Sequence, residues 1–260
     1  MTPTLLWIIG FTLLGGVLSA LAASAFLLAS AATRRRLVPH LVSFATGALL
    51  GAALLGLLPH AIDGAGPDHV HTVGLAVLVG ILIFFVLEKL VLWRHCHHDE
   101  CEAHAPTDEH RDAASATMVL IGDGLHNLLD GVLIGAAFLT DIQLGIVTSF
   151  AVIAHEIPQE VGEVAVLLQG GMSRAKALTY NLLISMTTVI GGVAAYYGLA
   201  DAPTALPYVL AVAASSFLYV AVADLIPGLH RKVDARTSVL QVALIAAGIA
   251  VIYFSHSAVH

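Results

Sequence analysis

The sequence predicts an all-α polytopic membrane protein, a bundle of eight transmembrane helices with both termini extracytoplasmic. Only 11% of its 260 residues are Asp, Glu, Lys or Arg, whereas soluble domains carry roughly 25%. Hydrophobic residues make up 58%, so the chain lacks the polar surface that a soluble protein needs. The net charge is −7, and together these values exclude a soluble enzyme and a nucleic-acid partner. The two cysteines provide no disulfide framework.

Each predicted span is a long apolar run with few or no charges. A membrane-spanning helix needs about 20 mostly apolar residues, and the chain holds eight such runs. None alternates with a period of two, which favours helices over barrel strands. The predicted spans cover residues 4–32, 39–62, 70–93, 113–140, 142–169, 177–200, 202–228 and 237–259.

The basic residues predict the orientation of these spans in a cell (inner) membrane. All 11 of them fall in or beside connections on one side of the bilayer: Arg34, Arg35, Arg36, Lys89, Arg94, Arg111, Arg174, Lys176, Arg231, Lys232 and Arg236. The other side carries Asp63, Asp68, Asp141 and Asp201. By the positive-inside rule the basic side is cytoplasmic, which places both termini outside. Because the first span has its arginines after it, we expect a retained anchor and not a cleaved signal peptide.

The longest connection is a histidine-rich cytoplasmic loop over residues 94–112. It reads RHCHHDECEAHAPTDEHRD and includes His95, His97 and His98. Cys96 and Cys101 are spaced as one C-x4-C pair, but no second pair completes a structural zinc site. The sequence therefore leaves two interpretations open, an auxiliary metal-binding loop and an ordinary solvated linker.

Spans four and five contain ionisable side chains where a membrane helix should be apolar. An Asp at the centre of such a helix costs about 2.5–3.5 kcal/mol on insertion scales. No lysine or arginine lies at matching depth in any span. Protonation would relieve part of this cost, and a bound cation would relieve more of it. The carboxylates concerned are Asp123, Asp130, Glu156, Glu160 and Glu163.

The spacing of these residues predicts that they gather on inward helix faces. In span four the set lies at i, i+3, i+4 and i+7, which is a single face: Asp123, His126, Asn127 and Asp130. In span five two stripes lie side by side, His155 with Gln159, and Glu156 with Glu160 and Glu163. Pro158 also leaves the carbonyl of Ala154 without its helical donor. Histidine, carboxylate and amide donors suit Zn²⁺, and also Fe²⁺, Mn²⁺ or Cd²⁺.

Other interpretations of the same residues remain open at this point. Carboxylate and histidine chains also serve proton relays, or they could have a purely structural role. The His155-Glu156 step begins like the H-E-x-x-H signature of zinc hydrolases. Gln159 replaces its second histidine, which weighs against an intramembrane zinc-dependent hydrolase. A metal-binding sensor without transport is a third alternative.

At these residues the chain resembles the ZIP (Zrt/Irt-like) family of divalent-metal transporters, of prokaryotic type. The likeness rests on HNLLDGVLIGAAF in span four and HEIPQEVGEVAVLLQGGMS in span five, with FLYVAVADLIP in span seven as weaker support. The resemblance covers essentially the whole chain. It implies a single transmembrane transport domain over residues 1–260 that imports divalent metal into the cytoplasm by an elevator-like movement.

The resemblance also implies a two-metal site between spans four and five. One metal would be surrounded by His126, Asp130, His155 and Gln159. A second would share Asp130 and add Asn127 and Glu156, with Glu160 and Glu163 as further family acids. Many relatives have histidine in place of Gln159, and some bacterial relatives carry a glutamate in span six, where residues 181–190 have no acid. We expect Zn²⁺ as substrate with Cd²⁺ as a surrogate, no organic cofactor, the lipid bilayer as surroundings, and a homodimer as one open oligomeric state.

Overall fold

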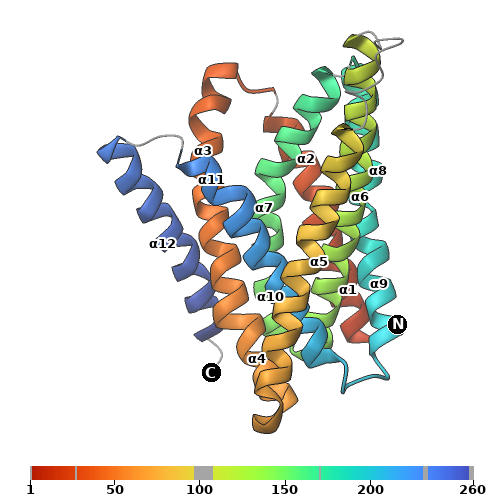
Figure 1. Ribbon diagram of the computed structural model, residues 1–260, viewed down its shortest axis with the longest axis vertical. Coiled ribbons are helices and arrows are strands. Elements are labelled where there is room, and N and C mark those ends of the chain that lie inside the picture. Colours follow the sequence, from red (N-terminus) through yellow and green to blue (C-terminus); the bar gives the residue numbers. More distant parts are fainter. Residues whose placement is uncertain (1, 27, 97–107, 170, 231–233, 258–260) are drawn as a thin grey trace.

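The computed structural model describes residues 2–26, 28–96, 108–169, 171–230 and 234–257, and within them every regular element is a helix (Figure 1). The first half comprises α1 (Pro3–Leu13), η1 (Leu14–Leu18), α2 (Ser19–Phe26), α3 (Ala31–Gly51), η2 (Ala52–Leu57), α4 (Leu58–Ala65), η3 (Pro67–His69) and α5 (Val70–Cys96). The second half comprises α6 (Asp108–Thr140), α7 (Ile142–Gln169), α8 (Arg174–Ser185), α9 (Thr187–Leu199), α10 (Leu206–Tyr219), η4 (Val220–Leu225), α11 (Ile226–Leu229) and α12 (Ala235–Ser257). The all-α class is confirmed.

Six helical segments are long and apolar enough to cross a membrane, where the sequence predicted eight. Among the described residues they are Pro3–Phe26, Arg36–Ala65, Pro67–Leu87, Arg174–Leu199, Leu206–Leu229 and Ala235–Ser255. The remaining two predicted spans correspond to α6 and α7, which are long helices but carry the ionisable side chains.

Several predicted boundaries were wrong because helices begin earlier or break within a predicted run. The first span ends at Phe26 and not near residue 32. The Ser30 hydroxyl accepts from the Thr33 backbone N–H and so caps the start of α3. Arg34, Arg35 and Arg36 therefore belong to the first turns of that helix, before or at the start of the apolar segment Arg36–Ala65. The sixth predicted span is divided at Met186 into α8 and α9.

The predicted loop over residues 94–112 is also shorter than expected. Helix α5 continues to Cys96 and α6 begins at Asp108, so His95 lies in the last turn of α5. His97, His98 and Cys101 lie outside the described residues.

Two π-helical segments precede prolines at equivalent places in α3–α4 and α10–α11. η2 ends immediately before Leu58-Pro59, and η4 ends immediately before Ile226-Pro227. A π turn accommodates one extra residue, so the helix can continue into a proline that lacks an N–H donor. The packing is reciprocal, because α3 contacts η4 and α10 contacts η2.

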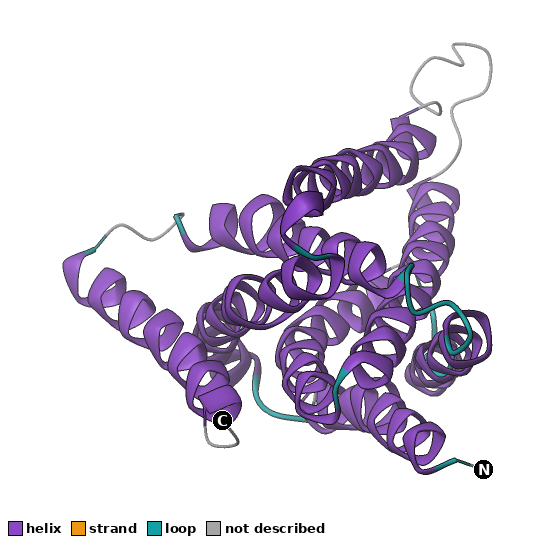
Figure 2. Ribbon diagram, turned by 90° about the horizontal axis from the view of Figure 1, so that it is seen from below, coloured by secondary structure: helices purple, strands orange, loops and turns teal. Residues whose placement is uncertain are grey.

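The apolar core lies among α3, α6, α7 and α10, and the outer helices shield it. Large side chains that are almost fully buried include Leu49, Ile134, Leu144 and Phe217. Helices α5 and α12 leave most of their apolar surface outside the bundle, and α12 lies at its periphery beside α3 (Figures 1 and 2). This arrangement places α6 and α7, which carry the ionisable residues, in the interior.

Candidate metal centre

Helices α6 and α7 form a tight antiparallel hairpin, which brings their polar residues to one level. A single residue, Asp141, separates them. Its carboxylate accepts from the Leu144 backbone N–H at 2.9 Å and thereby caps the first turn of α7. α7 continues through Pro158 as one helix. Residues at nearly equal separations from this turn on the two helices, such as 126 and 155, can therefore meet.

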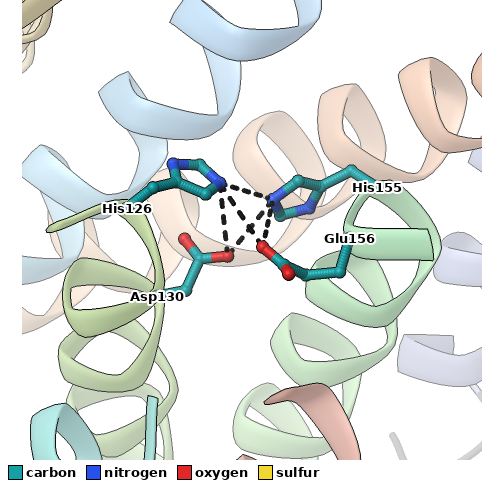
Figure 3. Close-up of side chains that lie close together, drawn as sticks. All are labelled: His126, Asp130, His155 and Glu156. Atoms are coloured by element: carbon teal, nitrogen blue, oxygen red, sulfur yellow. Dashed lines mark hydrogen bonds and ion pairs between the residues drawn. The ribbon is translucent and has the colours of Figure 1, made fainter. Parts of the chain in front are cut away.

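Four side chains from the hairpin converge on one point, and we call them the histidine site: His126 and Asp130 from α6, and His155 and Glu156 from α7 (Figure 3). The two Nε2 atoms of His126 and His155 lie 3.1 Å apart. His155 Nε2 lies 3.2 Å from Asp130 Oδ2, and His126 Nε2 lies 3.5 Å from Glu156 Oε1. One donor atom from each residue falls within 4.8 Å of all the others, so a single ion could contact all four.

The backbone holds His155 in a metal-binding orientation. Its Nδ1 lies 3.0 Å from the carbonyl oxygen of Ala151. Because a carbonyl can only accept, Nδ1 carries the proton and donates it. The lone pair of Nε2 then faces the other three ligands. A hydrogen bond from the second ring nitrogen is the usual way in which a protein orients a metal-binding histidine.

The carboxylates of the histidine site are buried and incompletely paired. Asp130 and Glu156 are each 1% exposed. Neither oxygen of Glu156 has a hydrogen-bond partner within the described part of the chain, and the same is true of Asp130 Oδ2. Their ion-pair contacts are with the two histidines. A buried carboxylate is costly unless it is paired or coordinates a metal, so this donor set fits a divalent cation.

One side of the histidine site is sealed and another is more open. Phe217 of α10 is 1% exposed, and its ring lies 6.1 Å from the ring of His155. His155 itself is 1% exposed, whereas the side chain of His126 is 18% exposed. The site is therefore more accessible beside His126 than beside His155.

A second group, which we call the acidic cluster, consists of Asp123, Glu160 and Glu163. One carboxylate oxygen from each lies within 4.8 Å of the others. Asp123 and Glu160 are 4% and 0% exposed. Neutral side chains surround these acids, and all of them donate hydrogen bonds. Asn127 donates to Asp123 at 2.6 Å, Gln159 to Glu163 at 3.1 Å, Ser185 to Glu160 at 2.9 Å, and Asn181 also donates to Glu160.

Close packing of α6 against α9 positions Asn127. A Cβ atom at Gly131 would overlap the carbonyl oxygen of Thr188, and one at Gly191 would overlap that of Leu128. Glycine at both positions lets the two backbones approach. Thr188 Oγ1 then reaches Asn127 Oδ1 at 2.7 Å and donates to it. The amide of Asn127 is thereby held with its nitrogen toward Asp123.

The structure groups the predicted site residues differently from the resemblance. It brings His126, Asp130, His155 and Glu156 together, and it directs Asn127 and Gln159 toward the acidic cluster. Sequence reasoning did not assign Asn181 to the site. Its signal was available, because Asn181, Ser185 and Thr188 are spaced i, i+4 and i+7 and share one helical face.

The fold and the two groups define an all-helical membrane-type protein with a buried site for metal-binding side chains. A family model described as "ZIP Zinc transporter" matches residues 4–116 and 93–256. The chain therefore belongs to the ZIP zinc transporter family. This family consists of metal transporters and not enzymes, so membership does not favour the hydrolase alternative.

Several animal proteins that are named as zinc transporters are similar to this chain. Zinc transporter ZIP5 of Homo sapiens is 34% identical over 258 residues, covering 76% of this chain and 48% of the relative. Zinc transporter ZIP13 of Pongo abelii is 31% identical over 226 residues, covering 82% and 65%. Zinc transporter ZIP10 of Homo sapiens is 43% identical over 139 residues, covering 52% and 17%. The chain thus spans less than two thirds of these relatives, and the expected prokaryotic type is not borne out.

Proposed function

We propose that this protein imports divalent transition-metal cations into the cytoplasm, with Zn²⁺ as the main substrate and the histidine site as its binding site. One observation carries the proposal. Two imidazole Nε2 atoms and two carboxylates lacking full hydrogen bonding face one another inside the helical bundle. The names of the relatives as zinc transporters support it independently.

The donor set accounts for the choice of metal. Two imidazoles and two carboxylates match the nitrogen and oxygen ligands with which Zn²⁺ forms tetrahedral sites. The same donors also accept Fe²⁺, Mn²⁺ and Cd²⁺, so we expect selectivity among these ions to be incomplete. Cd²⁺ serves as a surrogate in binding measurements.

We place α6 and α7 in the membrane as the fourth and fifth of eight crossings, within one transport domain over residues 1–260. Their ionisable side chains face each other inside the bundle, where the outer helices cover them. Helix α1 begins and α12 ends toward the same end of the bundle (Figure 1), which agrees with an even number of crossings. On this proposal that end is extracytoplasmic, and the ends of α5 and α7 are cytoplasmic.

We propose that transport involves sliding of one helix group past the other. The α6–α9 contact and the α3–α12 contact are both glycine-mediated, since a Cβ at Gly47 would overlap the Ile245 carbonyl and one at Gly248 that of Phe44. Each pair is thus close-packed as a unit. Helix α7 packs against α6 of one pair and against α3 of the other, so the α3–α7 contact forms the boundary between the two helix groups. Movement at that boundary would carry the histidine site between the two membrane faces.

Flux measurements test the proposal directly. The full chain is reconstituted into liposomes that enclose a zinc-responsive dye, and Zn²⁺ is added outside. We expect dye response in the wild type and its loss in His126→Ala and His155→Ala. His230→Ala, an exposed histidine at the end of α11, is the matched control and should retain flux.

Two other outcomes would contradict import. Stoichiometric Zn²⁺ binding without flux would indicate the metal-binding sensor, and zinc-dependent cleavage of a membrane peptide would indicate the hydrolase. Chemical crosslinking in the same liposomes tests the homodimer, which remains a prediction.

A further inference from the structure

The acidic cluster has no assigned part in zinc binding at the histidine site. Its three carboxylates gather within 4.8 Å, although like charges at this distance repel one another strongly in a buried environment. The donors from Asn127, Gln159 and Ser185 are all neutral. They satisfy individual oxygens and add no positive charge.

An unpaired oxygen beside the cluster points independently to a ligand. Asn181 is 1% exposed, and its Nδ2 donates to Glu160 Oε2. Its Oδ1 has no hydrogen-bond partner among the described residues. Because Oδ1 and Nδ2 belong to one amide group, this oxygen lies at the margin of the cluster. Glu163 Oε2 is likewise buried and unpaired there. Buried polar atoms normally have partners, and a cation would supply one to both.

The two groups lie in series along the helix hairpin. Glu160 and Glu163 follow Glu156 of α7 by four and seven residues, and Asp123 precedes Asp130 of α6 by seven. Because the helices are antiparallel, both displacements run in the same direction, by about 6–10 Å at 1.5 Å per residue. They lead toward the end of α7, near which α8 begins at Arg174. On the proposed orientation this is the cytoplasmic end.

We propose that Asp123, Glu160 and Glu163, together with Asn181 Oδ1, form a second cation site whose ligands are all oxygens, and that metal leaving the histidine site moves onto it. This inference rests on the proposed function. Oxygen-only ligands favour harder cations such as Mn²⁺ over the borderline metals that imidazole prefers. The second site should therefore hold Zn²⁺ less tightly than the histidine site, which allows release toward the cytoplasm.

Mn²⁺ binding to the full chain tests the second site separately from transport. The histidine site is removed with His126→Ala and His155→Ala, and bound Mn²⁺ is measured by electron paramagnetic resonance. We expect about one Mn²⁺ per chain, with no magnetic coupling to imidazole nitrogen. Adding Asp123→Asn and Glu163→Gln should abolish this binding, and Asn181→Ala should weaken it by about tenfold or more.

A matched experiment controls for misfolding. Asp123→Asn and Glu163→Gln are introduced into the chain that keeps both histidines, and this variant should retain Cd²⁺ binding at the histidine site. Asn181→Asp adds a carboxylate and should tighten Mn²⁺ binding. The inference is overturned if Mn²⁺ binding persists without the acids, if it shows histidine nitrogen coupling, or if the double-alanine chain binds none. A failure of zinc flux in the wild type would instead overturn the proposed function and leave these binding results unchanged.

Discussion

Thr188 Oγ1 on α9 donates a 2.7 Å hydrogen bond to Asn127 Oδ1 on α6. Asn127 is a residue that the family resemblance assigns to a second metal. In the structure this contact engages its amide oxygen, and its amide nitrogen faces Asp123. Asn127 thus links α9 to the acidic cluster. The amide group of Asn127 is engaged by these hydrogen bonds, and Asn127 is not one of the four residues of the histidine site.

Replacing Thr188 with valine tests this link. Thr188→Val removes the donor and leaves the buried Asn127 oxygen unpaired, which should cost about 1–3 kcal/mol of stability. The midpoint of thermal unfolding in detergent should fall accordingly. Ser238→Ala, which removes an exposed hydrogen bond from a half-buried serine of α12 to the backbone carbonyl of Asp234, is the control and should change the midpoint little. An unchanged midpoint in Thr188→Val would contradict the assigned hydrogen bond.

Gly131 offers a test of the close α6–α9 contact. A methyl group there would overlap the Thr188 carbonyl, so Gly131→Ala should force the helices apart and destabilise the protein by about 1–3 kcal/mol. The same substitution at Gly198 of α9 meets no atom within 4 Å. Gly198→Ala should be neutral or stabilising by up to about 1 kcal/mol. Thermal unfolding distinguishes the two, and equal effects would argue against close packing at Gly131.

Gln159 separates the ligand set in the structure from the one that the resemblance implies. Its amide nitrogen donates to Glu163 at 3.1 Å, which turns this end of the amide toward the acidic cluster. Gln159→Ala should therefore change Cd²⁺ affinity by less than about threefold, whereas His155→Ala should weaken it by about a hundredfold or more. Isothermal titration calorimetry measures both. A loss in Gln159→Ala that matches the loss in His155→Ala would restore Gln159 as a ligand.

Metal affinity should also depend on pH. A proton competes with the metal for His126 Nε2, for His155 Nε2 and for both carboxylates of the histidine site. Affinity should therefore be lower at pH 5 than at pH 7, because a protonated ligand cannot bind the metal. Cd²⁺ titrations at several pH values should show protons released on binding. Equal affinity at pH 7 and pH 5 would contradict ligation by imidazole.

Much of the fold could be predicted from the sequence because apolar length alone marks a membrane helix. Apolar length could not locate the break at Met186 or the start of α3 at Ala31, since helix caps and helix breaks within apolar runs do not alter hydropathy. For the site, helical spacing placed His126 and Asp130 on one face, and in the structure both belong to the histidine site. Spacing could not assign Glu156 and Glu160 to different groups, because they lie four residues apart on one stripe of the helix. The neighbouring helix distinguishes them, since Asn181 and Ser185 of α8 both donate hydrogen bonds to Glu160.

X-ray absorption at the zinc edge of the zinc-bound full chain tests the central claim most directly, because it reports the atoms that surround the ion. If His126 and His155 bind the ion jointly, the spectrum should show scattering from two imidazole rings per zinc. This number should fall to one ring in His126→Ala and remain two in the control His230→Ala. A zinc environment of oxygen alone, or one that His126→Ala leaves unaltered, would contradict the claim that these two histidines hold the transported metal.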